Sequence, residues 1–195
     1  DALIELARED EKIIGITAAM PDGTGISKFG KEFPDRTFDV GMAEQHGVSF
    51  AGALSIEGFR PVAAIYSTFL QRAYDQVVHD ICLMNLSVTF AMDRAGIVGE
   101  DGATHQILED IGLMKMLPGM TVINTCDYNQ TKAATLAIAE HKGPVYLRFG
   151  RPKVANFTSE EQKFEIGKAV VLQEGKDVTI IATGHLVWEA LQAAE

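Results

Sequence analysis

The stretch Gly41-Met-Ala-Glu-Gln-His-Gly-Val-Ser-Phe50 places an acidic residue, Glu44, at the start of an apolar segment. Phe38 and Val40 come just before it and indicate the end of a short buried strand. After it, apolar residues recur at the spacing of a mostly buried helix. They are Val48, Phe50, Ala51, Leu54 and Ile56. The stretch therefore predicts a strand, a turn and a helix that carries Glu44 near its N-terminus.

Spacing alone leaves two interpretations of Glu44, and it favours the first. In the first, Glu44 lies at an exposed helix end, where its negative charge interacts favourably with the helix dipole. In the second, Glu44 is buried, which is costly for a carboxylate unless it is paired, neutralised or used in function.

The composition indicates a globular domain of ordinary size, with room for the beginning of another. The chain has 195 residues, 47% of them apolar, which argues against disorder. A net charge of −10 argues against a nucleic-acid surface. The apolar runs are shorter than the roughly 18–20 residues that span a bilayer, and no signal peptide is expected, so a membrane partner is not predicted. Cys82 and Cys126 lie in apolar stretches without metal or redox spacing, as in reduced core residues of a cytoplasmic protein.

Apolar runs of strand length alternate with segments of helical period along the first 150 residues. We expect strands at 12–17, 38–40, 61–66, 88–92, 121–123 and 144–148. We expect helices at 2–8, from about 44 to 58, and at 72–86, 107–117 and 129–141. The alternation predicts an α/β fold, with a mainly parallel sheet that is covered by helices on both faces.

Parallel sheets of this kind bind their ligands outside the carboxyl ends of the strands. Three expected loops leave strands there, at 66–72, 93–105 and 148–153, and unusual polar residues gather in them. Residues 20–25 are expected to form a further loop, whose glycines do not match a dinucleotide-binding fingerprint.

The chain is expected to contain one domain and the start of a second. Residues 1–155 form the first domain, and 156–167 form a polar linker without period. Strands are expected at 169–172 and 178–182, followed by a helix from 186, so residues 168–195 are interpreted as the opening of a truncated second domain.

The stretch Phe38-Asp-Val-Gly-Met-Ala-Glu-Gln-His46 resembles the glutamate motif of thiamine-diphosphate enzymes of the transketolase superfamily. The resemblance implies a pyrimidine-binding domain in which Glu44 hydrogen-bonds the aminopyrimidine ring of thiamine diphosphate. By sharing a proton with a ring nitrogen, Glu44 would favour the tautomer that removes the thiazolium C2 proton. The cofactor then carries the bond-making chemistry, and the protein supplies position and electrostatics.

The stretch Ile65-Tyr-Ser-Thr-Phe-Leu-Gln-Arg-Ala-Tyr-Asp75 is similar to the 1-deoxy-D-xylulose-5-phosphate synthases of this superfamily. The resemblance implies that Phe69 stacks on the aminopyrimidine, that Met20 also contacts the cofactor, and that Tyr66 and Arg72 line the substrate side. The alternative is a set of core aromatics, with Arg72 and Asp75 as a helical i,i+3 pair.

The stretch Asp93-Arg-Ala-Gly-Ile-Val-Gly-Glu-Asp-Gly-Ala-Thr-His105 is the second strong match. The resemblance implies that Asp101 and His105 contact the substrate and assist its proton transfers. It also implies that Arg94 and Arg148 bind a terminal phosphate, which a guanidinium can grip with two hydrogen bonds. The alternatives are a surface histidine and a helix N-cap at Asp101.

Several residues are left without such a role. Arg151 and Lys153 are interpreted as solvated linker charges. The histidines outside this stretch have no metal-ligand spacing, so no metal site is expected in this chain. The Gly-Asp-Gly and Asn motif that binds Mg²⁺ and the diphosphate in the superfamily is missing. The diphosphate-binding half must then come from a preceding segment or another subunit, which predicts a homodimer or larger assembly.

The resemblance divides along the chain. Residues up to about 96 are most similar to the synthases, whereas those from Gly99 onward are more similar to the carboxyl half of a transketolase. The synthase reaction is favoured, because Tyr66, Arg72 and Arg94 belong to the expected cleft. In that reaction pyruvate loses carbon dioxide and its two-carbon fragment adds to glyceraldehyde 3-phosphate, in an isoprenoid precursor pathway. The alternatives are a transketolase subunit that transfers a ketol group between sugar phosphates in the pentose phosphate pathway, and a non-catalytic subunit that completes a partner's site.

Overall fold

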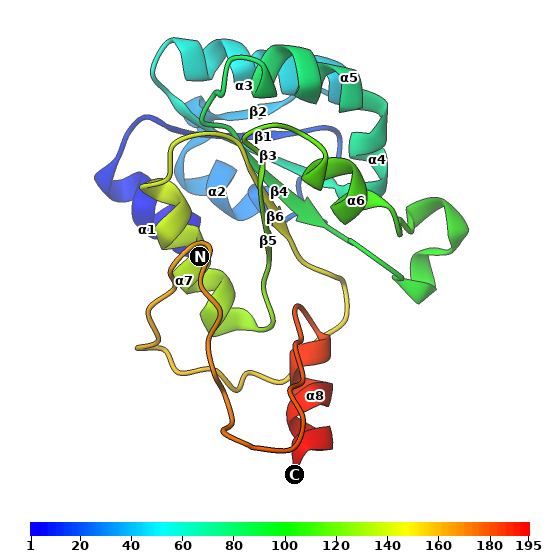
Figure 1. Cartoon of the computed structure of the whole chain (residues 1–195). Coiled ribbons are helices and arrows are strands. Elements are labelled where there is room, and N and C mark those ends of the chain that lie inside the picture. The colour runs from blue at the N-terminus through cyan, green and yellow to red at the C-terminus, as the bar shows by residue number, and fades with distance from the viewer.

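A computed structural model describes all 195 residues and contains one sheet of six parallel strands (Figure 1). The strands lie in the order β2-β1-β3-β4-β6-β5. Their bounds are Ile13–Thr17 (β1), Thr37–Asp39 (β2), Arg60–Tyr66 (β3), Thr89–Asp93 (β4), Thr121–Asn124 (β5) and Val145–Arg148 (β6). The predicted α/β class is confirmed, and all six strands form close to their predicted positions.

Helices cover both faces of the sheet, as predicted. One face carries α3 (Glu44–Ile56), α4 (Ser67–Leu70), α5 (Tyr74–Gln76) and α6 (Asp110–Lys115). The other carries α1 (Ala2–Glu9), α2 (Ile26–Glu32) and α7 (Tyr128–Ala139). In Figure 1, α3 and α5 lie above the sheet, and α1, α2 and α7 lie below it.

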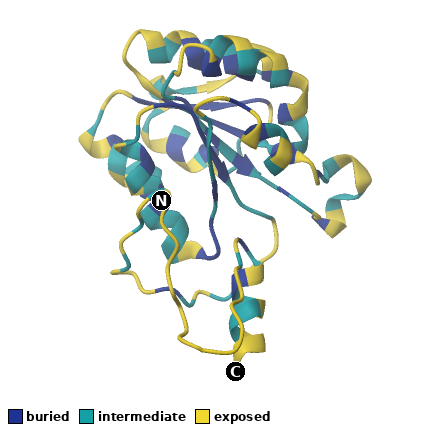
Figure 2. Cartoon of the chain, viewed as in Figure 1, coloured by how far each residue is buried: buried dark blue, intermediate teal, exposed yellow.

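The main core lies between the sheet and α3, where 18 buried residues form one cluster. Alternate residues of β4 show the two faces, because Phe90 and Met92 belong to this cluster whereas Ala91 packs on the opposite side. Two smaller clusters fill the opposite face, one beneath α1 and α2 and one beneath α7. The sheet is therefore the most buried part of the chain (Figure 2), except for the edge strand β2, where Phe38 is exposed and the expectation of a buried strand is wrong.

Two helical segments differ from their predicted bounds, and one helix was not predicted. The helix predicted at 72–86 begins earlier, at Ser67, and passes through 3₁₀ and π turns up to Cys82. Helix α6 begins at Asp110 rather than 107, because Ile107 pairs with Gly96 in an isolated β-bridge. Helix α2 was not predicted, since it is short, contains Gly30 and lacks a side-chain cap.

The strands predicted at 169–172 and 178–182 are absent, which is a correction to the sequence analysis. Both segments are exposed (Figure 2), and neither has a strand beside it with which to pair. An isolated apolar segment without a partner cannot satisfy its backbone hydrogen bonds as a strand. The helix expected after them forms as α8 (Leu186–Ala194). No helix of the chain has both the length and the apolar character needed to cross a membrane.

The order of the strands fixes where a ligand can bind. From β1 the chain moves outward to β2, and it then returns to β3 on the other side of β1 before continuing to β4. The loops after β1 and β3 therefore diverge at the carboxyl edge of the sheet and leave a crevice between them.

Asp127 fastens the segment that follows β6 onto α7. Its carboxylate accepts hydrogen bonds from the backbone N–H groups of Gln130, Phe157 and Thr158, at 2.9, 2.9 and 2.7 Å, and from the Thr158 hydroxyl at 2.7 Å. Burial by itself would raise the pKa of Asp127, but these hydrogen bonds hold its pKa below the ordinary value.

Replacing Asp127 by Asn should lower the free energy of unfolding by about 1–3 kcal/mol at neutral pH, because a helix cap and buried N–H partners are lost. Since the folded-state pKa is lowered, the contribution of Asp127 is present above the unfolded-state pKa of about 3.9 and is lost as the pH falls through the folded-state value. Urea denaturation of wild type and D127N between pH 7 and pH 3 should therefore show the difference shrinking with acid. Asp35→Asn is the matched control, because Asp35 is exposed and makes no side-chain hydrogen bond.

Candidate active site at the carboxyl edge of the sheet

Glu44 is the first residue of α3 and is buried, with a side chain only 2% exposed. The interpretation of Glu44 as an exposed helix-end residue is therefore wrong. Its Oε1 atom lies 3.3 Å from a terminal nitrogen of Arg72, whose own side chain is 56% exposed. Its Oε2 atom is buried and has no hydrogen-bond partner in the chain. An unpartnered buried carboxylate oxygen is expensive, so this atom is free to accept or share a proton with a ligand.

Three aromatic rings stand beside each other at the end of β3. Tyr66 and Phe69 are stacked with ring centroids 6.0 Å apart, and His105 meets Phe69 edge-on at 5.3 Å. Arg72 lies over the Phe69 ring at 5.2 Å, so the same guanidinium contacts both Phe69 and Glu44. The structure thus brings these predicted site residues together, although they come from three different segments.

Arg94 forms the charged side of the same edge. Its guanidinium lies 4.0 Å from the Tyr66 ring centroid and is paired with Asp93 at 3.1 Å and with Asp101 at 3.0 Å. Arg94 has a left-handed backbone (φ 58°), which is unusual for a residue other than glycine and indicates local strain. Arg151 also pairs with Asp101, at 3.2 Å.

Burial shifts two titratable groups in this cluster. Desolvation raises the pKa of Asp93, and Arg94 opposes the shift. Desolvation also raises the pKa of Tyr66, and Arg94 again opposes it, while Asp93 and Asp101 add to it. The Tyr66 hydroxyl therefore stays protonated and acts as a hydrogen-bonding group rather than a base.

The loop after β1 also reaches this site. A role there was expected for Met20 but not for Gly23. The sulfur of Met20 lies 3.1 Å from the backbone nitrogen of Tyr66, and the carbonyl of Gly23 accepts a hydrogen bond from Arg94 at 3.1 Å. A Cβ atom at residue 23 would lie 1.7 Å from the Tyr66 hydroxyl. Any side chain at residue 23 would therefore have to displace the Tyr66 ring, a constraint that the loop's composition alone could not reveal.

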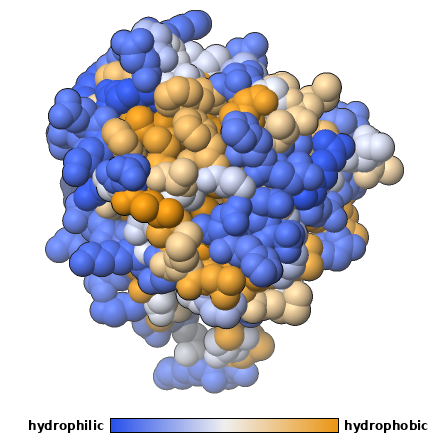
Figure 3. Space-filling view, turned by 90° about the horizontal axis from the view of Figure 1, so that it is seen from above, coloured by the Kyte–Doolittle hydropathy of each residue, from blue (hydrophilic) through white to orange (hydrophobic).

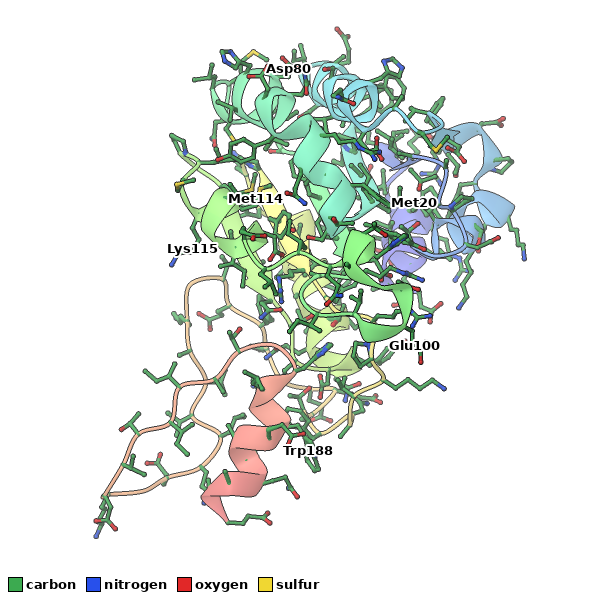
Figure 4. The ribbon with its side chains drawn as sticks, turned by 90° about the vertical axis from the view of Figure 1, so that its right-hand side faces the viewer. Met20, Asp80, Glu100, Met114, Lys115 and Trp188 are labelled. Carbon is green, nitrogen blue, oxygen red and sulfur yellow. The ribbon has the colours of Figure 1, made fainter.

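Figure 4 faces this edge of the sheet, with Met20 and Glu100 on loops that follow β1 and β4 and with Trp188 on α8 below them. Glu100 is paired with Arg151. Arg151 is exposed, as expected of a solvated charge, but it also pairs with Asp101 on the loop after β4. Asp101 and His105 share that loop, but each contacts different partners.

Arg148 lies at the end of β6 and belongs to a second group of contacts. Its Nε atom donates to Asp110 at 2.7 Å, and a terminal nitrogen donates to Asn124 at 3.2 Å. Asp110 also accepts hydrogen bonds from the hydroxyls of Ser67 and Tyr146, at 3.3 and 3.0 Å. Sequence reasoning missed Asp110, Ser67 and Tyr146, because a polar residue within a buried cluster gives no periodic signal.

A cavity of about 750 Å³ lies away from these residues. It runs between α1, α7 and the sheet, where Ile4, Phe29, Ala91, Ile138 and Leu147 are among its lining residues. None of the predicted site residues lines it, so its size is no argument that it is the active site. No group of three or more His, Cys, Asp or Glu side chains is placed to hold a metal ion.

Replacing Glu44 by Met should raise the free energy of unfolding by about 1 kcal/mol or more, because an apolar side chain of similar length removes a poorly compensated buried carboxylate. Arg72 is left half-exposed and can be solvated by water. Urea denaturation in the absence of ligand measures the change. Glu57→Met, at the exposed end of α3, should leave stability unaltered. A clear loss of stability in E44M would instead show that the pair with Arg72 stabilises the fold.

Curated relatives match the whole chain. A 1-deoxy-D-xylulose-5-phosphate synthase 1 of Geobacter sulfurreducens is 54% identical over 196 aligned positions, covering 100% of this chain and 31% of the relative. A 1-deoxy-D-xylulose-5-phosphate synthase of Heliobacterium modesticaldum is 48% identical, covering 100% of this chain and 30% of the relative. The chain thus spans about a third of the length of these relatives, and its similarity to the synthases is not confined to the first half.

Solved structures give the same fold. A split-gene transketolase, described as an inactive beta4 tetramer, is 42% identical with a TM-score of 0.90, covering 99% of this chain and 63% of that one. A transketolase of Pichia stipitis in complex with sedoheptulose-7-phosphate has a TM-score of 0.81 at 24% identity, covering 98% of this chain and 31% of that one. The second likeness concerns the fold alone.

A family model covers most of the chain. The model is that of the transketolase pyrimidine-binding domain, and it matches residues 1–156. This range contains the whole sheet and each of the site residues described above. The chain belongs to the transketolase pyrimidine-binding-domain family.

Proposed function

We propose that this chain is the pyrimidine-binding part of a thiamine-diphosphate-dependent transferase of the 1-deoxy-D-xylulose-5-phosphate synthase type. The single observation that carries the proposal is the buried, unpartnered Oε2 atom of Glu44. A ring nitrogen of an aminopyrimidine is the kind of group that can share a proton with such an atom. Identity of 47–54% to several synthases over nearly the whole chain supports the same reaction.

The residues at the carboxyl edge divide into a cofactor side and a substrate side. Glu44 and the ring of Phe69 would hold the pyrimidine, and Met20 would lie beside it. Tyr66 and Arg72 line the substrate side. When bound, thiamine diphosphate supplies a carbon nucleophile that adds to the keto group of the donor substrate. Glu44 contributes by holding a proton at the pyrimidine nitrogen, in a buried place from which water is excluded.

Two arginines suit the phosphate of a sugar-phosphate acceptor. Arg94 and Arg148 are both mostly buried, and each is held by a carboxylate that fixes its direction. His105 stands against the rings of Tyr66 and Phe69, and we assign it a part in the proton transfers of the substrate. Asp101 orients Arg94 and Arg151, so its part in proton transfer is the less direct one.

Other parts of the intact protein must complete this site. We infer that Mg²⁺ and the diphosphate of the cofactor are held by a separate domain or subunit. We also infer that residues 1–155 are one domain, which residues 156–167 join to the start of another, and that the protein is cytoplasmic.

Large apolar side chains are exposed on and near α3 and at the end of the following helical segment. They include Met42, Ile56, Leu83 and Met84. Figure 3 views the molecule from this side and shows apolar side chains gathered near its centre. A surface of this kind suits burial against another subunit.

A transketolase subunit is the second candidate. The observation in its favour is the TM-score of 0.90, at 42% identity, to a split-gene transketolase. Such a subunit would transfer a ketol group without releasing carbon dioxide. A third reading, in which the chain is a binding subunit without catalytic residues, is opposed by the presence of Glu44 in its buried position.

The reaction is tested with the intact protein, thiamine diphosphate and Mg²⁺. Pyruvate with glyceraldehyde 3-phosphate should release carbon dioxide, and xylulose 5-phosphate with ribose 5-phosphate should give no ketol transfer. Ketol transfer without carbon dioxide release would assign the chain to a transketolase instead.

The part played by Glu44 is tested by Glu44→Ala. The variant should fold and assemble but lose activity by several orders of magnitude, because the proton-sharing group is removed. A single general acid or base typically contributes about 10²–10⁴-fold to the rate. The rate of carbon dioxide release measures the loss. Glu57→Ala, at the other end of α3, should keep wild-type turnover. Wild-type turnover in E44A would remove the central role of this carboxylate.

Assembly gives a separate test. Light scattering of the intact protein should report a dimer or a larger species, since the site described here lacks a diphosphate-binding half and an apolar face is exposed. A stable monomer with full activity would contradict this expectation.

A further inference from the structure

A buried polar network lies beneath the candidate site. Asp110 is 1% exposed, Ser67 is 1% exposed and Tyr146 is fully buried. Four donor atoms lie within hydrogen-bond distance of the Asp110 carboxylate: the hydroxyls of Ser67 and Tyr146, and two nitrogens of the Arg148 guanidinium. The two hydroxyls are also 2.5 Å apart, so their two protons are shared among three contacts. Every member of the network therefore has a partner.

The network joins three elements that carry the site. Asp110 and Ser67 are the first residues of α6 and α4, and Tyr146 and Arg148 lie on β6. Ser67 directly follows Tyr66, so the same hydrogen bonds hold the segment of the aromatic rings and the guanidinium of Arg148.

Stability alone is a poor reason for such an arrangement. A buried ion pair usually contributes little compared with apolar side chains of the same volume, because both charges must first leave water. A fully hydrogen-bonded pair does fix direction, since the carboxylate engages Nε and one terminal nitrogen of Arg148 side by side. This pair lies at the carboxyl edge, where ligands bind in parallel sheets.

Some N–H groups of the Arg148 guanidinium have no partner within the chain. A guanidinium has five N–H groups. Asp110 takes one from Nε and one from Nη2, and Asn124 takes one from Nη1. One N–H then remains on each terminal nitrogen. Gly96 leaves space beside them, because a Cβ atom there would come within 3.1 Å of Nη2.

We propose that Asp110 is a positioning residue, which holds Arg148 in the one orientation that presents its remaining N–H groups to the phosphate of a substrate. Ser67 and Tyr146 support Asp110 in this role. The inference rests on the proposed function for the identity of the substrate, but the anion-binding role of the Asp110–Arg148 pair can be tested without turnover.

The first test measures the affinity for inorganic phosphate by calorimetry, using the intact protein loaded with thiamine diphosphate and Mg²⁺. Asp110→Asn should weaken phosphate binding about tenfold, since a charge-assisted hydrogen bond that orients the guanidinium is lost, worth roughly 1.4 kcal/mol. Asp127→Asn is the control, because it alters another buried carboxylate at a helix N-terminus whose hydrogen-bond partners are Gln130, Phe157 and Thr158 rather than Arg148. It should lower the melting temperature and leave phosphate affinity within about twofold.

A double-mutant cycle shows whether Asp110 acts through Arg148. In an Arg148→Met background, D110N should have no further effect on phosphate affinity. Additive losses in the cycle, or wild-type phosphate affinity in D110N, would overturn the proposal.

Kinetics separate this inference from the proposed function. D110N should raise KM for glyceraldehyde 3-phosphate about tenfold and leave KM for pyruvate and for unphosphorylated glyceraldehyde nearly unaltered. Equal losses with both acceptors would reduce Asp110 to a structural role and overturn the proposal. A wild-type protein that releases no carbon dioxide would refute the proposed reaction, and the phosphate titrations would still decide the role of Asp110.

Discussion

The parallel direction of all six strands is the constraint on which the site depends. Because every strand ends at the same edge, residues that are far apart in the sequence meet there. The pairing of β1 with β3 brings Met20 to Tyr66, and the pairing of β4 with β6 places the loop of Arg94 beside Arg148. The loops themselves are irregular, but each begins at the end of a strand, and the sheet fixes where the strands end. The strand order therefore determines which loops can meet at the site, and the loop sequences determine which side chains make contact there.

The charges at this edge are compensated within the chain. Arg94 is paired with Asp93 and Asp101, and Arg148 is paired with Asp110. This explains how a chain with a net charge of −10 can offer sites to a phosphate, since the relevant field is local. It also means that an anion reaching Arg94 must share or displace a carboxylate.

The sequence predicted the regular parts of this fold well and the non-local contacts poorly. The apolar strand runs and the helix after Glu44 have clear periods, and they formed as expected. The strands predicted at 169–172 and 178–182 did not form, because strand pairing needs a neighbour that a local pattern cannot supply. Gly23 and Asp110 were missed for a similar reason, since their roles depend on contacts with Tyr66 and Arg148, more than 35 residues away. Glu44 was located by its motif, but its burial became clear only from the packing of α3.

Glu44 and Asp110 are both buried carboxylates at helix N-termini, and the difference between them is informative. Oδ2 of Asp110 is contacted by Ser67, Tyr146 and Nε of Arg148, and Oδ1 is contacted by Nη2 of Arg148 at 3.5 Å, so both oxygens have a partner within the chain. Glu44 has one weak partner in Arg72 and an Oε2 atom with none. A fold gains nothing from burying an unpartnered oxygen, whereas a binding site does, because the missing hydrogen bond is supplied by the ligand. Burial alone does not identify a functional carboxylate. Whether its oxygens have partners within the chain is the better guide, and Glu44 has an unpartnered oxygen whereas Asp110 has none.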